Sequence, residues 1–391
     1  MARTILEPAP TVARARELGQ SLWQDELDRP TILSGRLAEL VQLGISGVTT
    51  NPTIFGKALA GSDAYEMAIQ HAASEHGNPQ KLLWELVIAD VQLAADVLRT
   101  VFNEQEGADG FVSIEVDPAL ADDSERTLAM VRDLWQRCDR PNVFVKIPAT
   151  KAGLPAIRQA LAEGINVNVT LIFSVSRYRE VVDAFMRGLE DRLEKGQDIS
   201  RLASVASFFV SRVDTKVDKR LDEMGEKALR GKAAIANSKL AYETWAELHR
   251  GPRWERLAQA GARRQRCLWA STSTKDPSYP DTKYVDALIG PETVNTMPHK
   301  TFLAFAGHGV AERTLDRGLE EAHRVVEDLK ARGIDLDQVG EELEREGVKL
   351  FADSWHAAGG LLGDELASAA YIGSELSFPA SDPPTTSPGS I

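Results

Sequence analysis

The chain has 391 residues, of which 43% are hydrophobic and 26% are charged, proportions that are ordinary for a globular protein with a large core. Its net charge of -13 argues against a nucleic-acid-binding surface. The first residues lack the apolar core of a signal peptide, and no apolar run approaches the roughly 20 residues of a membrane span. Two cysteines, Cys138 and Cys267, predict free thiols in a reducing compartment, so we expect a cytoplasmic protein without a nucleic-acid or membrane partner.

Short apolar strands alternate with amphipathic helices along most of the chain. The predicted strands are Ser21–Asp25, Gly47–Asn51, Phe111–Val116, Asn142–Ile147, Ile165–Ile172, Ser204–Val210, Cys267–Ser271 and Thr293–Met297. After about residue 300 only helical patterns continue. The predicted helices are Gln80–Phe102, Asp122–Arg137, Ser176–Glu194, Lys232–His249, Leu315–Ala331 and Leu336–His356.

This rhythm predicts an α/β fold, namely a parallel (β/α)₈ TIM barrel with additional C-terminal helices. A doubly wound open sheet is the alternative, but no glycine-rich dinucleotide fingerprint follows the first strand and no P-loop is present. We expect residues 1–376 to form a single barrel domain with N-terminal and C-terminal helical extensions. Residues 377–391 are rich in proline and serine, a composition typical of a disordered tail.

One lysine, Lys146, stands where ordinary packing would place an aliphatic residue. In the strand Asn142–Ile147, the period-two alternation turns Lys146 and Phe144 to the face opposite three β-branched residues. A buried lysine is costly unless it is paired or used, and burial favours the neutral amine that a nucleophile requires. The alternatives are a lysine whose ammonium reaches the rim of the fold and a lysine in a buried ion pair.

Other predicted strands also carry polar residues at alternate positions inside apolar runs. A surface strand would expose long charged side chains of both signs, whereas these positions hold amides, hydroxyls and isolated carboxylates. Such groups are typical of the lining of a polar cavity. The residues that share a face in this way are Thr49 and Asn51; Ser113 and Glu115; Asn166, Asn168 and Thr170; and Val205, Ser207 and Phe209.

The polar positions recur at the ends of successive strands. In a (β/α)₈ barrel the active site lies at the C-terminal ends of the strands. Asp25 ends the first predicted strand, Lys146 lies near the end of the fourth and Ser271 ends the seventh. Each residue has an ordinary explanation as well, because an aspartate can cap a helix and an asparagine can form a turn. Their recurrence on one strand after another favours a functional site.

Four motifs resemble the signatures of the transaldolase family, in the order and at the spacings of that family. The resemblance covers roughly residues 20–300, and the longer C-terminal region, with Thr293-Val-Asn-Thr-Met-Pro298, looks like the longer bacterial type. The four motifs are Gly47-Val-Thr-Thr-Asn-Pro52, Ser113-Ile-Glu-Val-Asp117, Val145-Lys-Ile-Pro148 and Ile165-Asn-Val-Asn-Val-Thr-Leu-Ile-Phe173.

This resemblance implies Schiff-base chemistry without a metal or an organic cofactor. Members of the family carry a three-carbon dihydroxyacetone unit between sugar phosphates on a lysine, and the iminium accepts the electrons of the carbanion. By this resemblance Lys146 forms the Schiff base and Asp25 exchanges the proton of the substrate hydroxyl. Glu115 activates a water for carbinolamine formation and dehydration, and Thr170 helps to hold that water. Asn51, Asn168 and Ser207 are expected to form hydrogen bonds with the hydroxyls of the dihydroxyacetone unit. Thr49 is expected to support Glu115 or the wall of the site.

The phosphate-binding end departs from the family pattern. The resemblance assigns the phosphate to Arg212, which follows the sixth strand, and to a Ser-x-Arg element after the seventh. This chain has Ser271-Thr-Ser-Thr-Lys275 there, so the second arginine is missing at that spacing. Ser271 and Lys275 are therefore the candidates for the second contact, with lysine as a compact point charge.

Three functions remain compatible with the sequence. The first is a transaldolase, a transferase of the pentose phosphate pathway that moves dihydroxyacetone from sedoheptulose 7-phosphate or fructose 6-phosphate to glyceraldehyde 3-phosphate or erythrose 4-phosphate. The second is a lyase related to fructose-6-phosphate aldolase, and the third is a non-catalytic sugar-phosphate-binding barrel. Lys146, Asp25 and Glu115 together favour an enzyme, and Phe209, where the related lyases have tyrosine, favours the transferase. A monomer and a homodimer both remain open.

Overall fold

The computed structural model describes residues 6–50, 56, 58–59, 62–75 and 77–376. The described strands form one closed parallel barrel, in which each strand pairs with the next and the eighth pairs with the first. The predicted (β/α)₈ barrel is therefore confirmed, and the doubly wound sheet is excluded because an open sheet has two unpaired edges. The strands are β1 (Gln20–Gln24), β2 (Ile45–Val48), β3 (Val112–Glu115), β4 (Val143–Pro148), β5 (Val167–Ile172), β6 (Ser204–Phe209), β7 (Arg266–Ala270) and β8 (Thr293–Met297).

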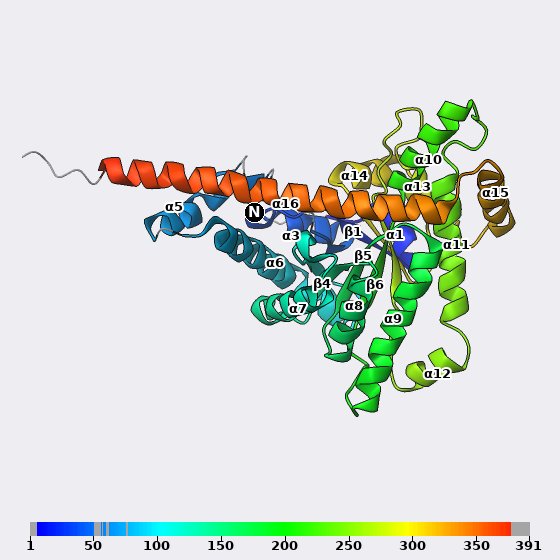
Figure 1. Cartoon of the computed structure of the whole chain (residues 1–391), viewed down its shortest axis with the longest axis horizontal. Coiled ribbons are helices and arrows are strands. Elements are labelled where there is room, and N and C mark those ends of the chain that lie inside the picture. The colour runs from blue at the N-terminus through cyan, green and yellow to red at the C-terminus, as the bar shows by residue number, and fades with distance from the viewer. Residues whose placement is uncertain (1–5, 51–55, 57, 60–61, 76, 377–391) are drawn as a thin grey trace, which may run out of the picture.

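Helices cover the outside of the barrel, and the longest of them, α16, runs across one end of it (Figure 1). None of the described helices is both long enough and apolar enough to cross a membrane. The α-helices are α1 (Pro10–Glu17), α2 (Arg29–Leu33), α3 (Arg36–Gln42), α5 (Glu66–Ser74), α6 (Pro79–Glu104), α7 (Ser124–Cys138), α8 (Gly153–Ala162), α9 (Val175–Glu194), α10 (Ser211–Met224), α11 (Ala233–Leu248), α12 (Pro252–Gln259), α13 (Lys283–Ala287), α14 (His299–His308), α15 (Leu319–Ala331) and α16 (Leu336–Leu376). The short 3-10 helices are η1 (Asp63–Tyr65) and η2 (Pro118–Leu120).

The C-terminal helices are confirmed, but their predicted ends are wrong. The last helix was expected to end at His356, whereas α16 continues to Leu376 and is 41 residues long. Three glycines between residues 359 and 363 lower the helix propensity there, which is why the pattern stops early. The helix before it begins at Leu319 instead of Leu315, after Gly318 in a left-handed conformation. The predicted disordered tail, 377–391, lies outside the described residues, and the single domain over 1–376 stays a prediction.

Several predicted strand ends also shift by one to three residues. Asp25 and Ser271 were placed inside strands and instead follow β1 and β7 directly. Strand β2 ends at Val48, so Thr49 lies in the loop after it. Each of these polar residues lies directly after the last residue of its strand, and the backbone N–H groups of Asp25 and Thr49 still donate to the neighbouring strands. They are therefore still positioned at the end of the barrel where active sites lie.

Aromatic side chains fill part of the barrel interior. The ring of Phe144 stacks on Phe111 with 4.2 Å between centroids and lies 6.2 Å from the ring of Trp23. Gly47 is required opposite Trp23, because a Cβ atom there would lie 2.4 Å from the indole. These rings separate the polar side chains at the C-terminal end of the barrel from a second polar cluster below them, in which Asp109 accepts from Trp23 Nε1 at 2.8 Å and from Ser46 Oγ at 2.8 Å.

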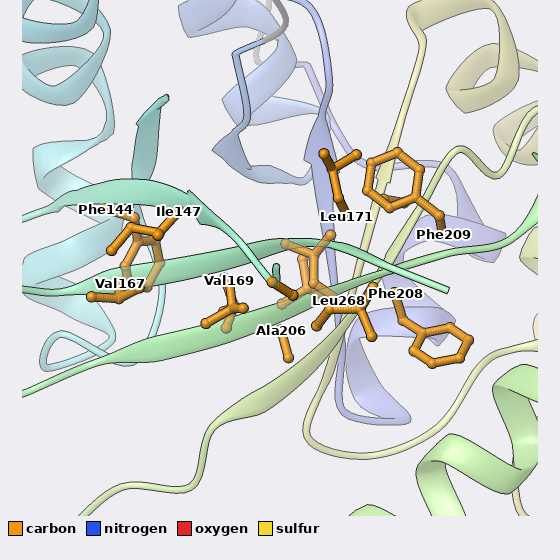
Figure 2. Close-up of a cluster of buried hydrophobic side chains, with 14 of the residues drawn as sticks. Phe144, Ile147, Val167, Val169, Leu171, Ala206, Phe208, Phe209 and Leu268 are labelled. Carbon is orange, nitrogen blue, oxygen red and sulfur yellow. The ribbon is translucent and has the colours of Figure 1, made fainter. Parts of the chain in front are cut away.

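The alternation of side chains along the strands separates the helix-facing core from the interior. Phe208 and Phe209 leave β6 on opposite sides (Figure 2). Phe208 packs against Tyr178 of α9, with 6.3 Å between ring centroids, whereas Phe209 lines the cavity at the end of the barrel. The same alternation along β5 turns Val169 away from the interior and leaves Thr170 in the cavity wall. The polar faces predicted from sequence therefore point into the barrel.

Candidate active site

A cavity of about 250 Å³ opens at the C-terminal ends of the strands. Most of the predicted site residues line it, and they come from the C-terminal ends of six strands and the loops or helix that follow. The roles of these residues stay predictions, but the structure brings their side chains together. The predicted residues in the cavity wall are Asp25, Thr49, Lys146, Thr170, Ser207, Phe209, Arg212, Ser271 and Lys275.

Lys146 of β4 is only 5% exposed, and its amine is held on two sides. Its Nζ donates to Glu115 Oε2 at 3.0 Å and to the backbone oxygen of Thr50 at 3.1 Å. Glu115 and Lys146 are direct partners in the register of β3 and β4, so the two side chains leave neighbouring strands at the same level. The buried ion pair that the sequence left open as an alternative is therefore present. It offsets part of the cost of burying the ammonium.

Glu115 lies behind Lys146 and does not line the cavity. Burial raises the pKa of Glu115 above its usual value, while the positive charge of Lys146 opposes that rise. Glu115 therefore places a desolvated carboxyl group directly beside the Lys146 amine.

Asp25 follows β1 directly at the rim of the cavity. Its backbone N–H donates to the Met297 oxygen of β8 at 3.1 Å, which fixes the residue between the first and last strands. Burial, and to a smaller extent repulsion from Glu26, raises the pKa of Asp25 to about 7, although Lys275 and Lys146 lower it. A carboxyl group that titrates near neutrality can both take up and return a proton.

Three buried oxygens in this region have no hydrogen-bond partner among the described residues. They are Asp25 Oδ1, Glu115 Oε1 and Thr170 Oγ1. Buried polar atoms in proteins are nearly always paired, so a group of exceptions around one lysine is informative. A ligand rich in hydroxyl groups could pair with such oxygens.

Strand β5 departs from regular geometry beside Thr170. Its pairing with β6 shifts between Val169 and Ile172, and Leu171 adopts a φ of +60°. A bulge of this kind bends the strand locally and is common beside active sites. A left-handed conformation in a leucine is also costly, and such strain is concentrated at functional positions.

Asn168 does not line the cavity, although it was predicted to bind substrate. Its Nδ2 donates to Ser113 Oγ at 3.0 Å, and its Oδ1 accepts from Ser207 Oγ at 2.7 Å, so it links β3, β5 and β6. Thr49 Oγ1 lies 2.8 Å from Thr296 Oγ1, which supports the wall. Asn51, the remaining predicted residue, lies outside the described residues.

Arg212 occupies the first turn of α10, just beyond β6. Its guanidinium carbon lies 5.1 Å from the ring centroid of Phe209 and 5.7 Å from that of Phe351. The nearby Asp214 is buried and accepts from the backbone N–H of Ala234 at 2.7 Å instead of pairing with Arg212. No carboxylate in the described part of the chain forms an ion pair with Arg212. Its charge thus remains available for an anion.

The loop after β7 supplies the other groups expected at the phosphate end. Ser271 adopts a φ of +56°, and its Oγ lies 2.9 Å from Ser211 Oγ at the start of α10. Lys275 is exposed and donates to Ser273 Oγ at 2.9 Å. Ser271, Ser273 and Lys275 therefore line the same cavity as Arg212.

Some residues of the cavity wall were not predicted from sequence. Thr296 could have been found, because it lies in the predicted eighth strand among polar neighbours. Ser273 follows Ser271 by two residues and fits the same hydroxyl-rich loop. Phe351 gave no signal, since it belongs to a helix whose position over the barrel follows from tertiary packing alone. The residues that the sequence patterns missed are Glu26, Thr50, Ala270, Ser273, Thr296, Pro298 and Phe351.

Comparison with known proteins assigns this arrangement to a family. A family model described as transaldolase/fructose-6-phosphate aldolase matches residues 22–362, most of the chain. The chain belongs to this family. The transaldolase-family membership predicted from the four motifs is thus confirmed.

Curated relatives of this transaldolase-family protein match it over nearly their whole length. The transaldolase of Acidothermus cellulolyticus is 54% identical over 348 residues, which is 88% of this chain and 94% of the relative. That of Parafrankia sp. is 52% identical over 90% of this chain and 97% of its own. The transaldolase of Mycobacterium tuberculosis is 49% identical over 89% of this chain and 95% of its own length. A solved structure of a putative fructose-1,6-biphosphate aldolase from Coccidioides immitis covers 92% of this chain and 95% of its own, with a TM-score of 0.27 and 12% identity.

Proposed function

We propose that the protein is a transaldolase that transfers a dihydroxyacetone unit from a ketose phosphate to an aldose phosphate through a Schiff base on Lys146. The observation that carries the proposal is the buried amine of Lys146, 3.0 Å from Glu115 at the end of a closed barrel. The relatives named transaldolase, at 49–54% identity, support the same activity. Sedoheptulose 7-phosphate and fructose 6-phosphate are the expected donors, and glyceraldehyde 3-phosphate and erythrose 4-phosphate the expected acceptors, as in the pentose phosphate pathway.

The first half of the reaction cleaves the donor. The neutral amine of Lys146 attacks the ketose carbonyl carbon, and the carbinolamine loses water with Glu115 and Thr170 holding the water that is exchanged. Asp25 removes the proton of the hydroxyl on the leaving-side carbon of the carbon–carbon bond that breaks, so the oxygen of this hydroxyl becomes the aldehyde oxygen of the aldose product. The bond cleaves, its electron pair passes into the iminium, and the aldose leaves.

The second half reverses these steps with a new acceptor. The carbon nucleophile on Lys146 attacks the aldehyde carbon, and Asp25 returns its proton to the new hydroxyl. Water then hydrolyses the iminium, which releases the product ketose and regenerates the amine. A pKa of about 7 suits Asp25 to both directions, since a general acid–base works best when its pKa lies near the working pH.

The direct test is a transfer assay with defined substrates. Fructose 6-phosphate and erythrose 4-phosphate should give sedoheptulose 7-phosphate and glyceraldehyde 3-phosphate, with little free dihydroxyacetone. Release of dihydroxyacetone as fast as transfer would indicate a lyase instead. Absence of both reactions would indicate a non-catalytic barrel.

The balance between transfer and release should depend on Phe209. A phenylalanine offers the carbon nucleophile no proton, so the intermediate persists until an aldehyde arrives. In Phe209→Tyr the phenol can donate a proton, so the ratio of dihydroxyacetone release to transfer should rise. Measurement of both products from fructose 6-phosphate with erythrose 4-phosphate checks this. An unchanged ratio would show that residue 209 does not control the fate of the intermediate.

The pH dependence should report the raised pKa of Asp25. Because cleavage needs the carboxylate, kcat/KM for fructose 6-phosphate should fall about tenfold per pH unit below pH 7. Asp25→Asn should lose cleavage at every pH. A profile that stays flat from pH 7 to pH 5 would contradict the role of Asp25.

The raised pKa of Asp25 also predicts that the stability of the protein changes with pH. The pKa of Asp25 is raised from its usual value of 3.8 to about 7 in the folded state, so the folded state binds the proton more tightly than the unfolded state. Its contribution to the free energy of unfolding is therefore lost as pH rises from about 4 through 7. Asp25→Asn should unfold at a higher temperature than the wild type at pH 8, with little difference at pH 4.

We also propose that the protein acts in the reducing cytoplasm, as a monomer or homodimer. The support for the compartment is that Cys138 and Cys267 are both free and buried. Burial raises the pKa of each thiol to about 12, so neither is a reactive thiolate.

A further inference from the structure

Helix α16 crosses one end of the barrel (Figure 1). Among the described residues of this helix, one side chain lines the cavity. That side chain is Phe351, which is only 3% exposed. Its ring centroid lies 5.8 Å from Lys146 Nζ and 5.7 Å from the guanidinium carbon of Arg212. One aromatic ring therefore lies beside both the amine and the expected phosphate anchor.

Two glycines allow α16 to approach the barrel closely. A Cβ atom at Gly340 would lie 2.8 Å from the Cβ of Ser174, and one at Gly347 would lie 2.9 Å from Leu171 Cδ2. Spacings of seven and four residues put Gly340, Gly347 and Phe351 on one face of the helix. The close approach thus brings the Phe351 ring down to the level of the cavity.

Ion pairs fix the same part of α16 against the helices around the barrel. Glu344 accepts from Arg177 of α9 at 2.9 Å. Glu342 pairs with Lys216 at 2.9 Å and with Arg220 at 2.6 Å, both on α10. Because α10 also carries Arg212, the helix that bears Phe351 and the helix that bears the phosphate anchor are held together.

We propose that Phe351 is a positioning residue of this site, with two effects that both rest on the proposed function. Its ring face, together with Phe209, holds the Arg212 guanidinium in place for a phosphate, since a cation is attracted to an aromatic face. Its bulk also keeps water away from the carbon nucleophile on Lys146. Water that reaches this carbon donates a proton to it, and hydrolysis of the resulting iminium then releases free dihydroxyacetone.

Two variants separate these effects. Phe351→Leu keeps an apolar cover but has no aromatic face, whereas Phe351→Ala removes both. Both variants should raise KM for fructose 6-phosphate about three- to tenfold and leave KM for fructose unchanged. The ratio of dihydroxyacetone release to transfer should rise about tenfold in Phe351→Ala and change much less in Phe351→Leu.

Trp355→Leu is the matched control on the same helix. Trp355 is buried one turn beyond Phe351, and its ring packs on Trp84 with 4.3 Å between centroids. It does not line the cavity. This variant should lower the melting temperature but change neither the phosphate preference nor the release ratio. Equal effects from Trp355→Leu and Phe351→Ala would overturn the proposal, because they would indicate a general loosening of α16.

A binding measurement keeps this proposal separate from the proposed function. Glucitol 6-phosphate has no carbonyl group and cannot form a Schiff base, so its Kd from calorimetry does not depend on turnover. That Kd should rise about three- to tenfold in Phe351→Leu. An unchanged Kd would overturn the role of Phe351 toward Arg212, whereas a wild type that binds the ligand but does not transfer would overturn the proposed function alone.

Discussion

Replacement of Lys146 by arginine should abolish transfer, with a loss in rate of about a thousandfold or more. Arginine retains the positive charge beside Glu115, so the buried carboxylate keeps a partner, but a guanidinium stays protonated and cannot attack a carbonyl. The rate of transfer from fructose 6-phosphate to erythrose 4-phosphate measures the loss. The melting temperature should remain close to that of the wild type, which separates lost chemistry from lost folding.

Lys151→Arg is the matched control for this change. Lys151 lies five residues later in the chain, is exposed and does not line the cavity. Its replacement should leave the transfer rate unchanged. Substantial transfer by a folded Lys146→Arg variant would show that the amine of Lys146 is not the nucleophile.

Replacement of Arg212 by alanine should raise KM for phosphorylated donors and acceptors about ten- to a hundredfold. A charged hydrogen bond contributes about 1.5–3 kcal/mol, and a guanidinium can bind two phosphate oxygens at once. Lys275→Ala should cause a smaller rise, because Lys275 is exposed and offers a single point charge. Activity on unphosphorylated fructose should change little in either variant.

Lys219→Ala removes an exposed cation from the same helix and should have no effect on KM. It controls for the change in net charge that all three substitutions share. If Arg212→Ala instead lost activity equally on fructose and fructose 6-phosphate, Arg212 would support the rim of the barrel and not the phosphate.

The barrel and the inward polar faces could be predicted because strand alternation is a local property of the chain. Lys146, Thr170, Ser207 and Phe209 were assigned to the interior by their parity within single strands, and all four line the cavity. The strand ends were predicted less accurately, since Asp25 was expected to end the first strand and instead follows β1. A strand ends where its ladder of hydrogen bonds ends, and that depends on the neighbouring strands.

Contacts between distant elements could not be predicted in the same way. The pairing of Glu115 with Lys146 depends on the register of β3 and β4, which neither strand specifies alone. The hydrogen bonds of the Asn168 amide with Ser113 and Ser207 depend on the relative positions of three strands. Phe351 reaches the cavity only because α16 packs closely over the end of the barrel. These features arise from tertiary packing, for which the sequence offers no periodic signal.

Borohydride reduction followed by mass spectrometry shows which lysine carries the covalent intermediate. The protein is incubated with fructose 6-phosphate, reduced and digested with trypsin, and fragment ions distinguish Lys146 from the nearby Lys151. We expect one adduct on Lys146, with the mass of dihydroxyacetone less one water plus two hydrogens, and none on Lys151. An adduct on another lysine, or no adduct from a preparation that is active in transfer, would show that Lys146 does not form the Schiff base.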